Sequence, residues 1–140
     1  MSWLLDTCVL SELVKPNPDD GLIEWINACD ESRMYLSALT LGELAKGIAR
    51  LSMGAKRKRL QAWLDNDLAR RFSGRILPID LSIAVCWGEL QAKAEQVGRP
   101  MPVVDGLIAA TAIFHVLTVV TRNGNDMAPS GVSIHNPWGK

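Results

Sequence analysis

The sequence predicts an α/β fold with a mostly parallel central sheet and helices on both of its faces. Short apolar runs alternate with longer amphipathic segments along the whole chain, and strands separated by helices pair in parallel through crossover connections. The chain has 140 residues, which suits a single domain over residues 1–140 with one sizeable hydrophobic core.

The first expected strand covers residues 3–6, a short apolar run that ends at an acid. Residues 8–15 can form a short helix, because the Pro-Asn-Pro sequence that follows ends it. A second helix is expected over residues 21–31, with Asp19 or Asp20 as its N-cap and apolar residues along one side.

Residues 34–38 form the second expected strand, and Thr40 is expected to open a helix over residues 41–51. A long helical segment follows at residues 55–72, where leucine and tryptophan side chains are spaced to form one stripe. Residues 75–80 are the third expected strand.

Asp80 can cap a helix over residues 81–97. A loop and a helix over residues 103–115 lead to the fourth expected strand, residues 117–121, which is rich in β-branched side chains. Residues 132–135 are expected to form a short edge strand.

Composition narrows the class of protein. Apolar residues make up 48% of the chain and charged residues 21%, so the chain is expected to fold. No apolar run reaches the roughly 18–20 residues that span a bilayer, and the N-terminus has no basic leader, so the expected location is cytoplasmic, with no membrane partner. Three scattered cysteines and two histidines argue against a disulfide framework, a zinc site and histidine-based catalysis.

The net charge is zero, but charge is distributed very unevenly along the chain. Between residues 46 and 75, nine basic residues are opposed only by Asp65 and Asp67, a balance of +7 that leaves −7 for the rest. This asymmetry indicates a polyanionic partner, although a solvated helix face is the commoner explanation of a basic run alone. The candidate nucleic-acid-binding residues are Lys46, Arg50, Lys56, Arg57, Lys58 and Arg59, with Arg70, Arg71 and Arg75 as further candidates.

Four acidic residues are expected to meet at one edge of the sheet. Asp6 ends the first strand, and Asp126 follows the fourth strand after a short loop. Glu43 and Asp105 lie in the first turns of two expected helices. Because helix N-termini and strand C-termini share one edge of a right-handed α/β sheet, all four carboxylates can reach one cleft.

Carboxylates gathered without histidine or cysteine are hard oxygen ligands, which suit Mg²⁺ or Mn²⁺. Without a cation the carboxylates would repel one another, and a divalent ion relieves that repulsion. Such an ion also activates a bound water and neutralises charge on a phosphoryl oxygen. An acidic metal site beside a basic helical arm therefore fits hydrolysis of phosphodiester bonds by a metal-activated water.

Each of the four acids also has a purely structural interpretation. Glu43 can close a capping box that starts at Thr40, and Asp105 can favour a helix N-terminus by its charge alone. Asp6 can be a helix cap, and Asp126 can be a turn residue. Taken singly, the structural interpretation is preferred for each, but four coincidences at one sheet edge favour a functional cluster.

Four segments resemble the acidic motifs of PIN-domain ribonucleases, in the order and approximate spacing of VapC-type toxins. They are LLDTCVLSEL at 4–13, LTLGELAKGI at 39–48, MPVVDGLIAATA at 101–112 and VVTRNGNDM at 119–127. The LSEL sequence in the first motif is similar to the FitB-like branch. The resemblance spans nearly the whole chain and implies a PIN-like nuclease domain.

The resemblance further implies a metal site of four carboxylates and two supporting polar side chains. The carboxylates are those of Asp6, Glu43, Asp105 and Asp126, and the supporting residues are Thr121 and Asn123. Asp6 and Asp105 are the best candidates for direct ligands, while the other two carboxylates act directly or through water. The expected protein is a Mg²⁺- or Mn²⁺-dependent endoribonuclease, the toxin of a type II toxin–antitoxin pair, homodimeric and inhibited by a cognate antitoxin.

Two positions depart from the family pattern. Cys8 stands where relatives often carry asparagine, and Met127 stands where an aromatic residue often follows the last acid. Neither is a proposed ligand, so activity is expected to survive, with substrate preference and fine geometry affected.

Three alternatives to a metal-dependent ribonuclease make different demands on the sequence. A non-catalytic PIN-like module could hold RNA or protein without cutting, which the loss of a carboxylate would support, and none is missing. A receiver-type signalling domain would need an acidic neighbour beside Asp6, which the sequence lacks. DNA in place of RNA stays open, because phosphate contacts carry no information about the sugar.

Overall fold

A computed structural model describes residues 1–139, and its five strands form one parallel sheet in the order β3-β2-β1-β4-β5. The strands are β1 (Trp3–Leu5), β2 (Met34–Ser37), β3 (Ile76–Leu77), β4 (Thr118–Val120) and β5 (Ile134–His135). All five lie where the sequence predicts them. From β1 the chain adds strands on one side of the sheet and then crosses to the other side, so the order reverses between β1 and β4.

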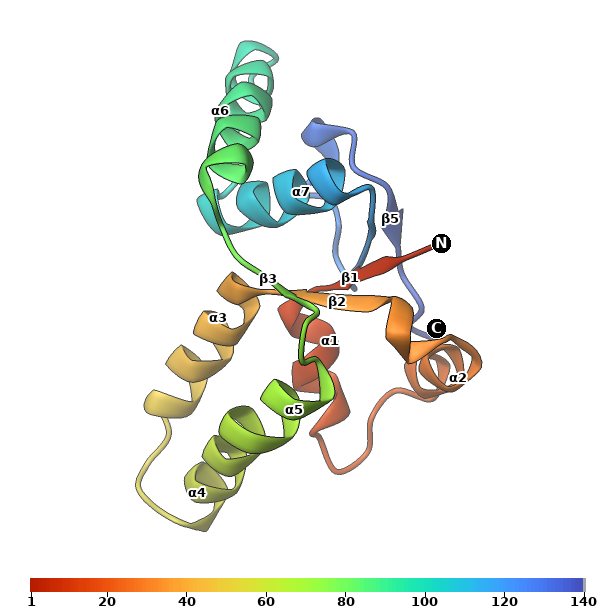
Figure 1. The fold of residues 1–140 in the computed structure, drawn as a ribbon, viewed down its shortest axis with the longest axis vertical. Coiled ribbons are helices and arrows are strands. Elements are labelled where there is room, and N and C mark those ends of the chain that lie inside the picture. Colours follow the sequence, from red (N-terminus) through yellow and green to blue (C-terminus); the bar gives the residue numbers. More distant parts are fainter. Residues whose placement is uncertain (140) are drawn as a thin grey trace.

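Helices cover both faces of the sheet, as the sequence predicts (Figure 1). They are α1 (Thr7–Leu13), α2 (Asp20–Ala28), α3 (Ala38–Ala49), α4 (Ala55–Ala62), α5 (Ala69–Arg71), α6 (Leu81–Gln96) and α7 (Val103–His115). Helices α1 to α5 lie on one side of the sheet, and α7, with α6 packed against it, covers the other side. A π-helical segment, Trp63–Leu68, joins α4 to α5, so the long helix expected over residues 55–72 is continuous but locally widened.

The two faces of the central strands fill two separate cores, because successive side chains of a strand point to opposite faces. In β1, Leu5 joins the core beneath α1 and α3, whereas Leu4 joins the core beneath α7. In β4, Val120 and Val119 divide in the same way. These strands are therefore buried on both faces, which explains why they appear in the sequence as uninterrupted apolar runs.

Helix starts follow from the capping side chains. Asp19 caps α2 through its Oδ2, which accepts from the Leu22 N–H at 3.0 Å, and Asp80 caps α6 as predicted. The start predicted for α3 is wrong: Ser37 caps this helix by accepting from the N–H of residue 39 at 3.1 Å. Thr40 is therefore buried inside the helix and does not begin it. Within residues 1–139, no helix has both the length and the apolarity needed to cross a membrane.

Candidate active site

Asp6 lies between the carboxyl ends of β1 and β4, where the strand order reverses. Its backbone N–H donates to the Val120 carbonyl at 3.0 Å, and its Oδ1 accepts from the Thr7 N–H at 2.8 Å. Its Oδ2 accepts from the Thr121 hydroxyl at 2.9 Å. Burial raises the pKa of the Asp6 carboxyl, the hydrogen bonds from the Thr7 N–H and the Thr121 hydroxyl oppose the rise, and the charge of Glu43 adds to it. Two hydrogen bonds thus orient the carboxylate at the point of the sheet where parallel α/β folds usually bind ligands.

Thr7 links Asp6 to Glu43. While its N–H binds Asp6, its hydroxyl donates to Oε1 of Glu43 at 2.5 Å. Glu43 lies in the second turn of α3, not in the first turn as expected, because the helix already begins at Ala38. The capping-box interpretation of Glu43 is therefore wrong, and its carboxylate faces α1 instead.

Asp105 stands in the first turn of α7, as predicted, and is half-buried. Burial raises the pKa of its carboxyl, and the negative charges of Asp6, Asp126 and Glu43 raise it further. Asp105 thus lies within electrostatic range of the other three acids, at the carboxyl edge of the sheet. In Figure 1 the beginnings of α3 and α7 both lie at this edge, on opposite sides of the sheet.

The loop after β4 carries the other three expected site residues. Thr121 is buried and holds Asp6 through its hydroxyl. The Asn123 N–H donates to Thr121 Oγ1 at 3.4 Å, and the Asn123 Oδ1 accepts from the Asn125 N–H at 3.3 Å, so Asn123 orders the loop itself. Asp126 is exposed near the end of the loop.

Cys8 contacts the start of the loop after β4. Its Sγ lies 3.5 Å from Thr121 Oγ1 and accepts from the Arg122 N–H at 3.5 Å. Because the single hydroxyl proton of Thr121 is donated to Asp6, the Cys8 thiol is the donor in its contact with Thr121. Burial raises the pKa of this thiol, which favours the protonated form. The sequence singled out Cys8 only as a departure, and it missed Thr7, whose signal was a hydroxyl directly after the first acid.

These carboxylates fit a divalent cation by their chemistry. Among residues 1–139, no three acidic, cysteine or histidine side chains stand close enough together to surround an ion. Burial, and secondly the charges of neighbouring acids, raise the pKa values of Asp6 and Asp105, and a bound cation would favour their ionised forms. Hard carboxylate oxygens of this kind are the donors that divalent ions such as Mg²⁺ and Mn²⁺ prefer.

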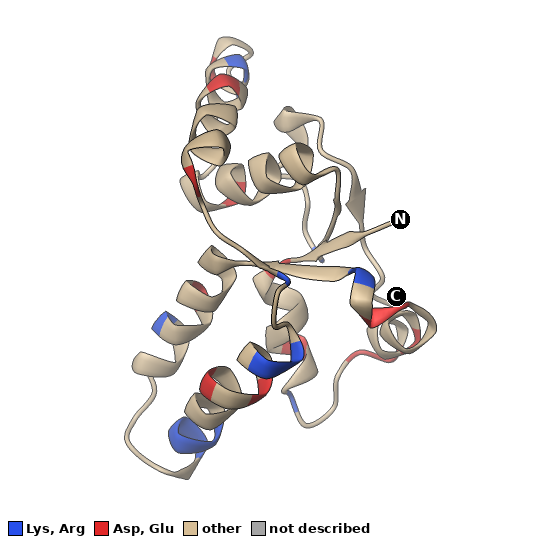
Figure 2. Ribbon diagram, viewed as in Figure 1, with Lys and Arg blue, Asp and Glu red and all other residues tan. Residues whose placement is uncertain are grey.

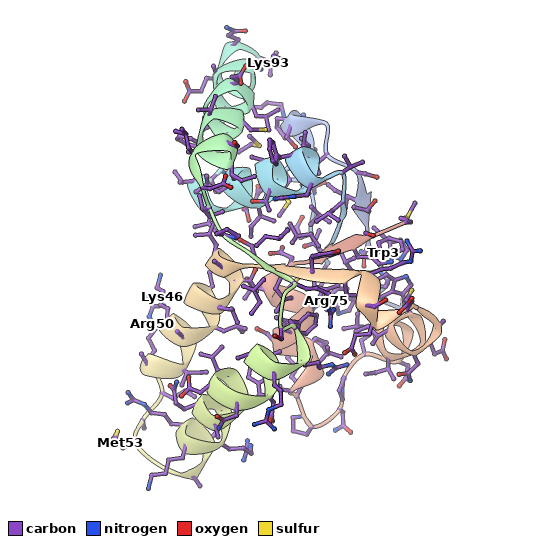
Figure 3. All side chains as sticks on the ribbon, viewed as in Figure 1. Trp3, Lys46, Arg50, Met53, Arg75 and Lys93 are labelled. Atoms are coloured by element: carbon purple, nitrogen blue, oxygen red, sulfur yellow. The ribbon has the colours of Figure 1, made fainter. Side chains whose placement is uncertain are left out.

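The expected basic platform divides into free and engaged cations. Lys46 and Arg50 are exposed and point away from α3 (Figure 3), and Figure 2 shows further basic residues along α4 and α5. On α4, Lys56, Lys58 and Arg59 are exposed. Arg57 is the exception among the six main candidates, because its Nη1 donates to the Leu51 carbonyl at 3.2 Å.

Arg71 and Arg75, named as further candidates, both make contacts within the fold. The Arg71 Nε donates to Glu31 Oε1 at 2.8 Å. The Arg75 guanidinium donates to the carbonyls of Glu31, Met34 and Arg71, at 2.7, 2.6 and 2.6 Å. Arg75 therefore ties the end of the long helical segment to the start of β2, and its place on the nucleic-acid platform stays a prediction.

Comparison with known families matches residues 3–128 to the PIN domain. The chain belongs to the PIN domain family. Toxin FitB of Neisseria gonorrhoeae is 38% identical to this PIN domain over 135 residues, which cover 96% of this chain and 97% of FitB. The VapC ribonuclease Y4jK of Sinorhizobium fredii is also 38% identical over 135 residues, 96% of each protein.

Solved structures agree with the sequence relatives. A structure of FitAB bound to an IR36 DNA fragment contains a chain with a TM-score of 0.93 and 35% identity, which covers 99% of this PIN domain and 96% of that chain. Solved toxin–antitoxin complexes at 24% identity share the fold. The PIN domain is thus a homologue of FitB and VapC toxins, and the resemblance found in the sequence is confirmed. PIN-domain ribonucleases depend on metal ions.

Proposed function

We propose that this chain is a single nuclease domain that acts as the toxin of a type II toxin–antitoxin pair and cleaves RNA with Mg²⁺ or Mn²⁺. The observation that carries the proposal is the arrangement of Asp6, Glu43 and Asp105 at the point where the strand order reverses. Two of these acids are joined through Thr7, and the charge of both acts on the third. The relatives named as ribonucleases support the choice of RNA.

Asp6 and Asp105 are the residues we expect to hold the ion directly, and Glu43 and Asp126 would bind it directly or through water. When bound, a divalent ion supplies positive charge that activates water and stabilises charge on the phosphoryl oxygens. Thr121 keeps Asp6 oriented by its hydrogen bond. In the hydrolysis, the oxygen of water adds to phosphorus, the bond to the 3′-oxygen breaks, and that oxygen takes a proton.

Helix α3 connects the acidic site to the basic platform. Glu43, Lys46 and Arg50 follow one another at three- and four-residue spacing, so they lie along one face of the helix. A phosphate backbone bound by Lys46 and Arg50 would therefore lead toward Glu43. The exposed cations of α4 extend this platform and supply the salt-dependent part of the affinity.

An apolar groove between α1, α3 and α4 is our candidate for the antitoxin. It encloses about 620 Å³ and is lined by apolar side chains together with Lys15, Lys56 and Arg59. Trp63 and Leu60 form one wall of the groove. These features fit an amphipathic segment that carries acidic residues.

Because the solved FitAB complex binds a DNA fragment, we extend the proposal to a DNA-binding complex of antitoxin with a toxin homodimer in the cytoplasm.

The proposal is tested by cleavage of a panel of labelled structured RNAs without antitoxin. The comparison includes Mg²⁺, Mn²⁺ and EDTA, with Asp105→Asn as the matched inactive variant. We expect cutting that requires metal and is lost in the variant. Tight RNA binding without any cutting across the panel would instead favour the non-catalytic binding module, and cutting of DNA alone would change the substrate.

A further inference from the structure

The C-terminal residues 134–139 lie outside the part of the chain that matches the PIN domain family, residues 3–128, yet they contact the site loop closely. We propose that residues 134–139 form a strap that positions the site loop, residues 121–126, and that Asn136 is its positioning residue. The inference rests on the proposed function, because it concerns how that loop presents Thr121 and Asp126 to the carboxylate site.

Asn136 holds the loop at Arg122, the first residue after Thr121. Its Nδ2 donates to the Arg122 carbonyl at 3.2 Å, and its Oδ1 accepts from the Trp138 N–H at 3.0 Å. The N–H of Arg122 is bound by the Cys8 thiol on the other side. Arg122 is therefore held between α1 and the strap, which fixes the direction in which the chain leaves β4.

Gly124 gives a second, independent contact between loop and strap. A Cβ atom at this position would lie 2.6 Å from Cδ1 and 2.8 Å from Cγ2 of Ile134. The backbone of the loop thus contacts the side chain of Ile134 in β5, and a methyl group at Gly124 would force that side chain or the loop to shift. The position of the loop therefore depends on where Ile134 lies.

The far end of the strap is anchored on α2. The Gly139 N–H donates to Oδ2 of Asp19 at 2.8 Å, and Asp19 is also the N-cap of the helix. A Cβ atom at Gly21 would lie 2.6 Å from the Gly139 nitrogen and 2.9 Å from the Pro137 oxygen. Trp138 packs against the core beneath α1 and α3. A segment fixed at both ends can hold the loop that it crosses.

The first test compares Asn136→Ala with Asn27→Ala, a matched control at an exposed position on α2. Amide hydrogen exchange of residues 122–126 is measured in the metal-free protein, and Mn²⁺ binding is measured without RNA. We expect Asn136→Ala to speed exchange in this loop at least several-fold and to weaken Mn²⁺ binding by less than the roughly 10-fold typical of a residue bonded directly to a ligand, because Asn136 acts through the Arg122 carbonyl. Asn27→Ala should match the parent in both measurements.

The second test exploits the contact between Gly124 and Ile134. Gly124→Ala should speed loop exchange and weaken Mn²⁺ binding, and adding Ile134→Ala should restore both toward the parent, because it removes the atoms that clash. Parent-like loop exchange in Asn136→Ala, or no restoration in the double variant, would overturn the proposal. Failure of the parent to bind Mn²⁺ would count against the proposed function alone, because loop exchange tests the strap without metal.

Discussion

The hydroxyl of Thr121 donates a 2.9 Å hydrogen bond to Oδ2 of Asp6, and this bond joins the ends of the two central strands at the candidate site. Thr121 is buried, so its hydroxyl has no access to solvent as an alternative partner. Thr121 is therefore the one side chain that donates to the Asp6 carboxylate among the described residues. The second donor to this carboxylate is the backbone N–H of Thr7.

Removing that hydroxyl should weaken catalysis more than folding. Thr121→Val keeps the shape of the side chain but leaves Oδ2 of Asp6 without this donor, which costs about 1–3 kcal/mol of stability. We expect cleavage to fall about 10- to 100-fold. Thr121→Ser retains the hydroxyl and should keep most of the activity. Equal activity of the Val and Ser variants would show that the hydrogen bond has no role.

Asp105 gives a prediction about the dependence of stability on pH. Its pKa is raised in the folded protein by burial and by three neighbouring acids, so the folded chain holds the proton more tightly than the unfolded chain. The ionised carboxylate therefore lowers stability progressively as pH rises from about its ordinary pKa of 3.8 through the raised value. Asp105→Asn removes this effect, and the metal-free variant should be at least as stable as the parent at pH 7.

The measurement is the thermal midpoint of both metal-free proteins between pH 4 and pH 7. The advantage of Asp105→Asn should shrink as pH falls, because the parent carboxyl becomes protonated and resembles the amide. A variant that is less stable at pH 7 by an amount independent of pH would assign Asp105 a structural role at the start of α7.

The strands and the order of the acids were predictable because they are local patterns. The central strands β1 and β4 are runs of apolar residues buried on both faces, and this pattern shows in the sequence without any knowledge of neighbours. Asp6 follows directly from the end of the first run, and Asp105 from the start of a helix. Strand ends and helix starts share one edge of the sheet, so the two positions were predictable together.

The start of α3 and the contacts between residues far apart in the sequence were not predictable. Ser37 and Thr40 are both good N-caps by type, and only the backbone direction after β2 decides for Ser37, which moves Glu43 into the second turn. The bond between Thr7 and Glu43 joins residues 36 positions apart and depends on how α1 packs on α3. The role of Arg75 was hidden for the same reason, because its three carbonyl partners come together only in the fold.

Free and engaged cations should respond differently to substitution. Lys46→Gln combined with Arg50→Gln should weaken RNA binding and reduce its dependence on salt by about two counterions, with little change in thermal stability. Arg75→Gln should lower the thermal midpoint, since it removes the guanidinium that binds three carbonyls, among them that of the buried residue Met34. Binding as a function of salt concentration, together with thermal melts, checks both. Loss of stability in the double variant would show that α3 cations are structural.

Val116 ends α7 in a left-handed conformation, with φ of 57° and 86% of the residue exposed. A β-branched residue is strained in this region, where glycine is not, and little packing is lost on its removal. Val116→Gly should therefore stabilise the protein by about 1 kcal/mol, or about 3 °C in thermal midpoint. Val97→Gly is the matched control at the end of α6, where φ is −95°, and it should give no gain. Destabilisation by Val116→Gly would show that this exposed side chain has a packing role.

The central claim is that the carboxylates of Asp6, Glu43, Asp105 and Asp126 together hold a divalent ion. Equilibrium binding of Mn²⁺ to the metal-free protein, followed through the paramagnetic signal of free Mn²⁺, tests it most directly. The parent, Asp105→Asn and the exposed control Asp67→Asn are compared in the same buffer. The account predicts binding by the parent and by Asp67→Asn, and at least 10-fold weaker binding by Asp105→Asn. Equal binding by all three proteins, or none by the parent, would contradict it.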